Sequence, residues 1–198
     1  FQTGGLGYSY TKGVLCMHEF EYVSKKMAAP HKRNLIFLLN EVQKEVKEYF
    51  TFRYDFIGSS SRNMITREVN GNIGYDFDAN IEPNVHKEEF SAEQIHRVIF
   101  EAFQKHMGKF GYSKIENSTS VITIKAVDKE NSRVEHSCDI AIVYNYSNGQ
   151  QQYIRCYKGW RLSYRWENRD KQYDIAEKLN LIEENKLKPS LRERYLIN

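Results

Sequence analysis

The chain of 198 residues has no long apolar run and only three cysteines. No segment approaches the ~18 apolar residues of a membrane-spanning helix, and the N-terminus lacks the basic and then apolar layout of a signal peptide. We therefore expect a cytoplasmic protein with no membrane partner. The cysteines, Cys16, Cys138 and Cys156, are odd in number and lack metal-ligand spacing, which predicts reduced, mostly buried thiols rather than a disulfide scaffold.

The chain also has little excess of charge of either sign, because its formal net charge is only +3. This balance is compatible with a polyanionic ligand such as a nucleoside triphosphate, but it does not indicate a dedicated nucleic-acid binder, which would carry a concentrated basic stripe. The length is sufficient for one substantial core with at most a small appendage. Charged residues make up 28% of the chain and aromatic residues 14%, as expected of a globular protein rich in Tyr and Phe.

Two amphipathic helices are predicted. Apolar residues recur at helical spacing from Lys32 to Phe50, and Pro30 is expected to start this helix. Ser91 resembles an N-cap, and the apolar stripe that follows it ends near Gly108. A weaker apolar stripe beyond Trp166 predicts a charged, helical C-terminal segment.

Alternation and β-branched residues predict strands after each of these helices along the chain. We expect Pro83 to end the second strand, and Asn148-Gly149 to form a type I′ turn before the last strand. The two strands on either side of residues 128–133 should pair as an antiparallel hairpin. The expected strands are Phe52–Ile57, Ile73–Ile81, Val121–Val127, Val134–Tyr144 and Gln151–Tyr157.

Three aspartates in these strands carry the strongest chemical signal. Side chains alternate along a strand, so Asp76 and Asp78 point to the same side, with Cα atoms roughly 6.5–7 Å apart. Two carboxylates this close repel each other unless a cation lies between them, and a hard divalent ion such as Mg²⁺ is their natural partner. Asp139 would add a third carboxylate, while alternation places His136 and Cys138 on the opposite face of its strand.

The order of these motifs resembles the nucleotidyltransferase superfamily with DNA polymerase β-like folds. The matching residues are Ile57-Gly58-Ser59, Asp76-Phe77-Asp78 and Asp139, and the resemblance spans about residues 32–145. The long interval before Asp139 is most similar to oligoadenylate and cyclic-dinucleotide synthases. The resemblance implies an α/β (α+β) fold: a mixed, largely antiparallel sheet flanked by helices. The expected organisation is a leader segment (1–30), a nucleotidyltransferase-like domain (31–167) and a helical C-terminal extension (168–198).

The resemblance also implies a set of site residues. Asp76, Asp78 and Asp139 would be catalytic and would bind Mg²⁺ or Mn²⁺. The nucleotide would contact Gly58, where the absence of a Cβ lets phosphate approach the backbone, together with Ser59, Ser60 and Arg62. The implied reaction transfers a nucleoside monophosphate from a nucleoside triphosphate, most simply ATP, to an acceptor hydroxyl, with release of pyrophosphate. The acceptor, whether a nucleotide, an RNA end, a protein or a small molecule, is not specified by the sequence, and neither is the oligomeric state.

Other interpretations of the same residues stay open. Asp-x-Asp also occurs in haloacid dehalogenase-like phosphatases and metal-dependent glycosyltransferases, although Asn80 and the preceding Gly58-Ser59 fit these classes poorly. The three acids could be unrelated surface residues, Arg62 could be a solvated loop residue, and the domain could be a non-catalytic nucleotide-binding or protein-interaction module. The aromatic and basic segment 144–169 is compatible with base stacking or with a sheet that has one packed aromatic face and one solvated basic face.

Overall fold

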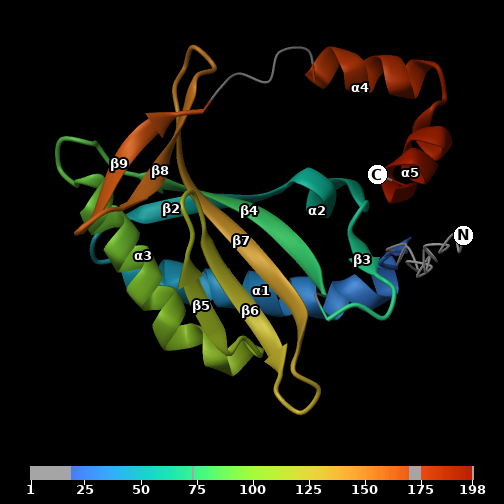
Figure 1. Cartoon of the computed structure of the whole chain (residues 1–198). Coiled ribbons are helices and arrows are strands. Elements are labelled where there is room, and N and C mark those ends of the chain that lie inside the picture. The colour runs from blue at the N-terminus through green and yellow to red at the C-terminus, as the bar shows by residue number, and fades with distance from the viewer. Residues whose placement is uncertain (1–18, 73, 170–174, 198) are drawn as a thin grey trace, which may run out of the picture.

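A mixed β-sheet with helices on one face forms the centre of the protein (Figure 1). The computed structural model describes residues 19–72, 74–169 and 175–197. The elements in chain order are β1 (Phe20–Tyr22), α1 (Lys25–Val46), β2 (Thr51–Ile57), α2 (Gly58–Arg62), β3 (Thr66–Glu68), β4 (Tyr75–Asn84), α3 (Ala92–His106), the 3₁₀ helix η1 (Met107–Phe110), β5 (Lys114–Asn117), β6 (Ile122–Asp128), β7 (Arg133–Asn145), β8 (Gln151–Lys158), β9 (Leu162–Asn168), α4 (Ile175–Glu184) and α5 (Lys188–Ile197).

The main sheet has the order β2-β4-β7-β6-β5. All neighbouring strands in it are antiparallel except β4 and β7, which are parallel and pair over Tyr75–Ile81 and His136–Ile142. The end of β7 continues into pairing with β8, which pairs in turn with β9, while β1 and β3 form a separate ribbon. The predicted mixed, largely antiparallel sheet is confirmed.

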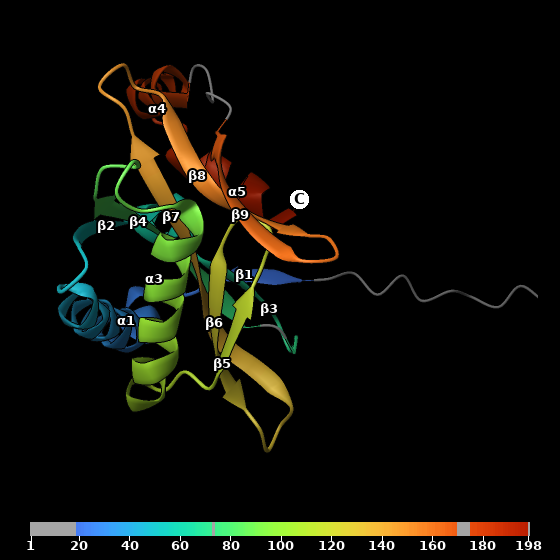
Figure 2. The same ribbon diagram turned by 90° about the vertical axis from the view of Figure 1, so that its left-hand side faces the viewer.

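Helices α1 and α3 pack against each other and cover one face of the main sheet (Figure 2). Apolar side chains fill the space between the helices and the sheet, and Leu38, Ile99 and Phe77 are fully buried there. The predicted N-terminus of α3 is confirmed, because Ser91 and Gln94 form a reciprocal capping box. The opposite face of the main sheet has no such helical layer among the described residues.

Two expectations about proline are wrong. Helix α1 begins at Lys25, after the N-cap Ser24, so Pro30 lies inside the helix rather than at its start. Pro83 lies within β4 and is paired with Phe52. It is tolerated because the pairing of β4 with β7 ends at Ile81, so this part of the strand has only one neighbour and no ladder bond is lost on the other side.

The turn before β8 also differs from the expectation. Gly149 has a φ of +79°, but Asn148 does not have a positive φ, which a type I′ turn requires at both central residues. The hydrogen bonds from Tyr146 N–H to Gln150 O and from Gly149 N–H to Tyr146 O close a wider loop. The predicted antiparallel pairing of β6, β7 and β8 is nevertheless confirmed.

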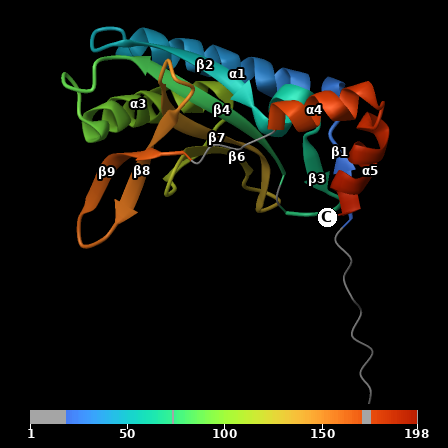
Figure 3. The ribbon, with the colours of Figure 1, turned by 90° about the horizontal axis from the view of Figure 1, so that it is seen from above.

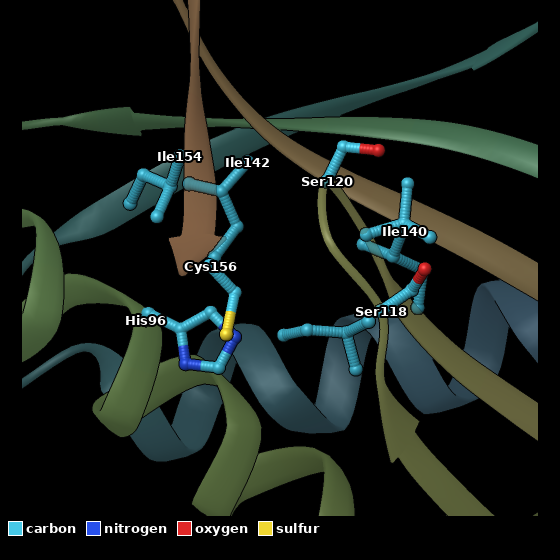
Figure 4. Close-up of a pocket in the computed structure, with 9 residues that line it drawn as sticks. His96, Ser118, Ser120, Ile140, Ile142, Ile154 and Cys156 are labelled. Atoms are coloured by element: carbon cyan, nitrogen blue, oxygen red, sulfur yellow. The ribbon is translucent and has the colours of Figure 1, made fainter. Parts of the chain in front are cut away.

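The β8–β9 hairpin bends away from the main sheet on the side opposite α1 (Figure 3). Ile154 and Cys156 of β8 anchor it against Ile140 and Ile142 of β7, next to His96 of α3 (Figure 4). Only a minute cavity of about 10 Å³ remains between them. Cys156 and Cys138 are free, buried thiols, as predicted, whereas Cys16 lies outside the described residues.

Helices α4 and α5 occupy the C-terminal segment for which helical character was predicted, although Tyr173 of the predicted stripe lies outside the described residues. Helix α5 contacts β1, where Tyr22 Oη donates to the Arg192 carbonyl oxygen at 2.6 Å. The predicted domain boundary at residue 30 falls inside α1, and the one at residue 167 falls inside β9. Among the described residues, no helix combines the length and apolar character needed to cross a membrane.

Candidate active site

The three aspartates come together on the open face of the main sheet. Asp76 and Asp78 lie on β4 and Asp139 on the neighbouring parallel strand β7, where Asp78 and Asp139 are direct register partners. Two residues toward the start of each strand, on the same face, Asp76 pairs with Ser137. In a parallel pair, register partners project to the same side of the sheet, so the three carboxylates share one small area.

Alternation along β4 produces this arrangement. Tyr75, Phe77 and Ala79 are buried under the helices, whereas Asp76 is exposed and Asp78 is half-buried on the other side. The same rule holds for β7, where His136 packs under α1 and stacks on His31 at a centroid distance of 4.0 Å. His136 and the buried Cys138 are therefore outside the aspartate cluster, as predicted.

Two hydroxyl groups hold the carboxylates. Ser137 Oγ donates to Asp76 Oδ1, and Thr123 Oγ1 of β6 donates to Asp139 Oδ1 at 2.6 Å. The sequence analysis missed both residues. Alternation could have indicated Ser137, which lies two residues before Asp139. Thr123 is placed by the register of β6 with β7, where it is the partner of Asp139, and no local pattern reveals that register.

The electrostatics of the cluster follow from burial and like charge. Burial raises the pKa of the Asp78 carboxyl, and the charges of Asp139 and Asp76 raise it further. Burial also raises the pKa of Asp139, which the hydrogen bond from Thr123 opposes. The group of carboxylates is thus under-compensated by the surrounding protein, and a bound cation would relieve its repulsion.

The donor chemistry fits a hard divalent cation, but the cluster is not a ready-made metal site. Within the described ranges, no set of three or more His, Cys, Asp or Glu side chains is arranged to hold a metal ion. Two of the carboxylates point an oxygen at a hydroxyl donor instead, as described above.

The Gly58–Arg62 segment forms the short helix α2 beside Asp78. Gly58 has a φ of +59°, and a Cβ there would lie 3.0 Å from Asp78 Oδ2, so only glycine fits without strain. Ser60 is buried and its hydroxyl accepts a hydrogen bond from the Asp78 N–H at 2.8 Å. The backbone of β4 is thereby fixed to the Gly-Ser segment.

The nucleotide contacts predicted for this segment stay predictions. Ser60 is committed to the Asp78 backbone, and its carbonyl oxygen accepts from Lys32 Nζ at 3.3 Å. Ser59 is half-buried, whereas Arg62 is exposed at the end of α2. All of these residues lie on the Asp78 side of the cluster.

A cleft of about 490 Å³ opens on the other side of the cluster, toward β6 and the end of β8. Asp76, Ser137 and Asp139 form part of its wall. Two cationic side chains, Lys125 and Lys158, also line the cleft. Lys125 Nζ donates to Glu116 Oε2 at 2.6 Å, and hydrogen bonds from Lys114 and Lys125 lower the pKa of Glu116 to about 2.

Solved structures with a similar fold include CD-NTase CdnG from Bradyrhizobium diazoefficiens, in complex with GTP. It matches with a TM-score of 0.55 and 13% identity, over 74% of this chain and 39% of that chain. DncV from Vibrio cholerae, a cyclic AMP-GMP synthase and prokaryotic cGAS homolog, matches with a TM-score of 0.48 and 12% identity, over 74% of this chain and 51% of that chain.

The 3′-deoxy ATP-bound form of the same Vibrio cholerae protein matches with a TM-score of 0.47 and 15% identity, over 75% of this chain and 39% of that chain. This protein thus spans between 39% and 51% of the length of these three structures. No protein-family model matches the sequence, and no curated protein matches it. The likeness to CdnG confirms the nucleotidyltransferase fold expected from the motifs.

Proposed function

We propose that the protein is a metal-dependent nucleotidyltransferase. It would transfer a nucleoside monophosphate from a nucleoside triphosphate, with ATP as the proposed donor, to an acceptor hydroxyl. The observation that carries this proposal is the register of β4 and β7, which brings Asp78 beside Asp139 and next to the Gly58-Ser59 segment. The fold shared with CdnG, a CD-NTase solved with GTP, supports the same class.

Asp76, Asp78 and Asp139 would hold Mg²⁺ or Mn²⁺. When bound, the metal would neutralise charge on the phosphates and make the acceptor hydroxyl easier to deprotonate. The chemistry of the donors supports this assignment, because three carboxylates share one area and repel one another without a cation.

The residues of the chain would divide the remaining work. The acceptor oxygen bonds to the α-phosphorus, the bond from that phosphorus to the bridging oxygen breaks, and pyrophosphate leaves with the electron pair. Asp139, which the hydrogen bond from Thr123 holds in place, would receive the proton of the acceptor hydroxyl. Ser137 would orient Asp76 in the same way. Gly58 and Ser59 would approach the β- and γ-phosphates, and Arg62 would add a guanidinium contact.

Pyrophosphate release tests the proposal. The protein is incubated with each of the four nucleoside triphosphates, Mg²⁺ or Mn²⁺ and a panel of acceptors, and products are separated by chromatography. We expect release that stops in Asp76→Ala and in Asp139→Ala. The matched control is Asp55→Ala, because Asp55 is exposed on β2 of the same sheet and forms no hydrogen bond with the aspartate cluster. Release that continues in Asp76→Ala would assign the activity to something else.

A non-catalytic nucleotide-binding or interaction module with the same fold is the second candidate. One observation favours it, namely that the three carboxylates are not arranged as a ready-made metal site. Titration with Mn²⁺, followed by paramagnetic relaxation of water protons, separates the two candidates. Binding that disappears in Asp78→Asn supports the enzyme, whereas nucleotide binding without any Mn²⁺ dependence supports the module.

A further inference from the structure

The net positive charge of the protein is concentrated in the β8–β9 hairpin. Residues 151–169 contain five cationic side chains against one carboxylate, a net charge of +4, whereas the whole chain carries +3. The rest of the molecule is thus close to neutral. The cations are Arg155, Lys158, Arg161, Arg165 and Arg169. The modest overall charge thus conceals a local basic surface, which lies in the aromatic and basic segment 144–169 for which base stacking was one of the two open interpretations.

The arginines share one face of the hairpin. The register pairs Arg155 with Arg165, and the side chains of Ile154 and Cys156, one position away, are buried on the opposite face. Both guanidinium groups lie over the ring of Tyr157, with distances of 5.5 Å and 5.8 Å to its centroid. Arg169 lies over Tyr153 in the same way, at 5.4 Å. This outward face therefore carries arginines stacked on tyrosines.

These cations are not neutralised by the described part of the protein. The single carboxylate of the hairpin, Glu167, accepts a hydrogen bond from Tyr157 Oη. Among the described residues, Arg155 and Arg165 form no ion pair, and Arg155 Nε is buried without a hydrogen-bond partner. Arg165 is exposed and Arg155 is half-buried, and phosphate is the anion that guanidinium groups hold best through paired hydrogen bonds.

The tip of the hairpin adds an unshielded aromatic ring. The exposed fraction of Trp160 is 107%, so this residue is fully open to solvent. Lys158 and Arg161 flank it. An indole ring beside cations offers a surface on which a nucleobase can stack while the adjacent phosphates are held, and such stacking does not depend on the base.

We propose that the outward face and tip of the β8–β9 hairpin bind single-stranded nucleic acid. The charge spread along both strands fits a chain of phosphates, and Trp160 at the tip fits an unpaired base. A lipid surface would instead need the cations gathered in a ring at the inserted tip, whereas Arg155, Arg165 and Arg169 lie along the strands away from it. This inference does not depend on the aspartate cluster, because the binding it describes needs neither metal nor triphosphate.

Fluorescence anisotropy with a labelled 20-nucleotide oligo(dT) or oligo(U), without metal or triphosphate, tests the proposal. We expect binding that weakens at least about ten-fold in the double variant Arg155→Glu/Arg165→Glu, and about ten-fold in Trp160→Ala. The exposure of Trp160 means that its replacement leaves the fold intact. Removing the two arginine contacts should also flatten the plot of log K against log salt by about 1.4.

The matched control is Lys26→Glu/Lys129→Glu. It makes the same change in net charge at two exposed residues far from the hairpin in sequence, which form no ion pair with any described residue. Equal weakening of binding in this control would show that the effect depends on net charge alone, and it would overturn the proposal. Unchanged binding in both hairpin variants would also overturn it, as would binding only to phosphatidylserine vesicles. A duplex that binds as tightly as the single strand, without sensitivity to Trp160→Ala, would refute the stacking of an unpaired base.

Discussion

The covered and open faces of β4 and β7 are built from alternate residues of the same two strands. On the covered face, Phe77 and Ile140 are fully buried against the helices. On the open face, one residue away in each case, lie Asp78 and Asp139. The covered face gains free energy from apolar burial, whereas the open face places like charges together at a cost. One strand pair thus separates stability from the proposed chemistry, and the predictions below test this separation.

Asp78→Asn should have the largest effect on the open face. We expect nucleotidyl transfer to fall by at least about a hundred-fold, since a metal contributes several kcal/mol to stabilisation of the transition state. The melting temperature at neutral pH should not fall, because the substitution removes a repelling charge from a half-buried position. Steady-state kinetics and differential scanning fluorimetry on one preparation measure both. Loss of activity together with loss of fold would contradict the separation of the faces.

Phe77→Ala tests the covered face. Its ring is fully buried and packs edge-on against Tyr75 and Phe56. We expect the free energy of unfolding to drop by about 3–5 kcal/mol, since the lost contacts leave a cavity under the helices. Urea unfolding followed by circular dichroism provides the measurement. A drop below about 1 kcal/mol would show that this face contributes less than its burial indicates.

Gly58→Ala should affect both stability and nucleotide binding. A φ of +59° strains alanine, and its Cβ would lie 3.0 Å from the Asp78 carboxylate. Gly149→Ala is the matched control, because φ is +79° there and no atom lies within 4 Å of an added Cβ. Both should lose about 1–2 kcal/mol of stability, but only Gly58→Ala should also reduce nucleotide binding, measured by isothermal titration calorimetry. Equal nucleotide binding in the two variants would remove Gly58 from the site.

The pH dependence of stability tests the charges of the aspartate cluster, and its expected effect is smaller. The pKa of Asp78 in the folded state is raised by burial, then by Asp139 and Asp76, so the folded state holds this proton more tightly than the unfolded chain. The contribution of Asp78 to folding stability is therefore most favourable below its ordinary pKa, where the carboxyl is protonated. That stability is lost as pH rises through the raised pKa of the folded state.

Relative to the native protein, Asp78→Asn should accordingly melt a few degrees higher at pH 7 and at nearly the same temperature near pH 3. Adding Mg²⁺ at pH 7 should raise the melting temperature of the native protein but not of the variant. Thermal melts across this pH range, with and without the metal, provide the test. A constant difference at all pH values would mean that charge is not its cause.

Thr123→Val should have the smallest effect. It removes the hydroxyl that donates to Asp139 at 2.6 Å but keeps the shape of the side chain. We expect transfer to slow by about ten-fold with little change in stability, because Asp139 keeps its place and loses only its orientation. Thr51→Val, at an exposed position of β2, is the control for a lost strand hydroxyl. Equal rates in the two variants would show that Thr123 does not position Asp139.

Much of the local structure could be predicted from the sequence. The capping signal at Ser91 located α3, and alternation assigned Asp76 and Asp78 to one face while excluding His136. Strand β9 and the short strands β1, β3 and β5 were missed. The pairing of β1 with β3, for example, joins residues 20–22 to residues 66–68, and such brief segments carry little alternation of their own.

The partners of the site were the least predictable part. Ser137 and Thr123 contact the aspartates through register, and Ser60 reaches the Asp78 backbone through the path of α2. The basic and aromatic character of the hairpin was visible in the sequence, but the shared face of its arginines was not. Only the pairing of β8 with β9 aligns Arg155 with Arg165.

The sequence by itself determined which side chains share a face of each strand, because alternation is a property of the local backbone. The positive φ of Gly58 and its close approach to Asp78, which make its replacement costly, became visible only in the structure. The tertiary structure alone decided that β7 lies beside β4, although Asp139 follows Asp78 by 61 residues and α3, β5 and β6 intervene. Strand order depends on how the whole sheet buries its apolar face against α1 and α3, and that is a sum of distant contacts rather than a local pattern.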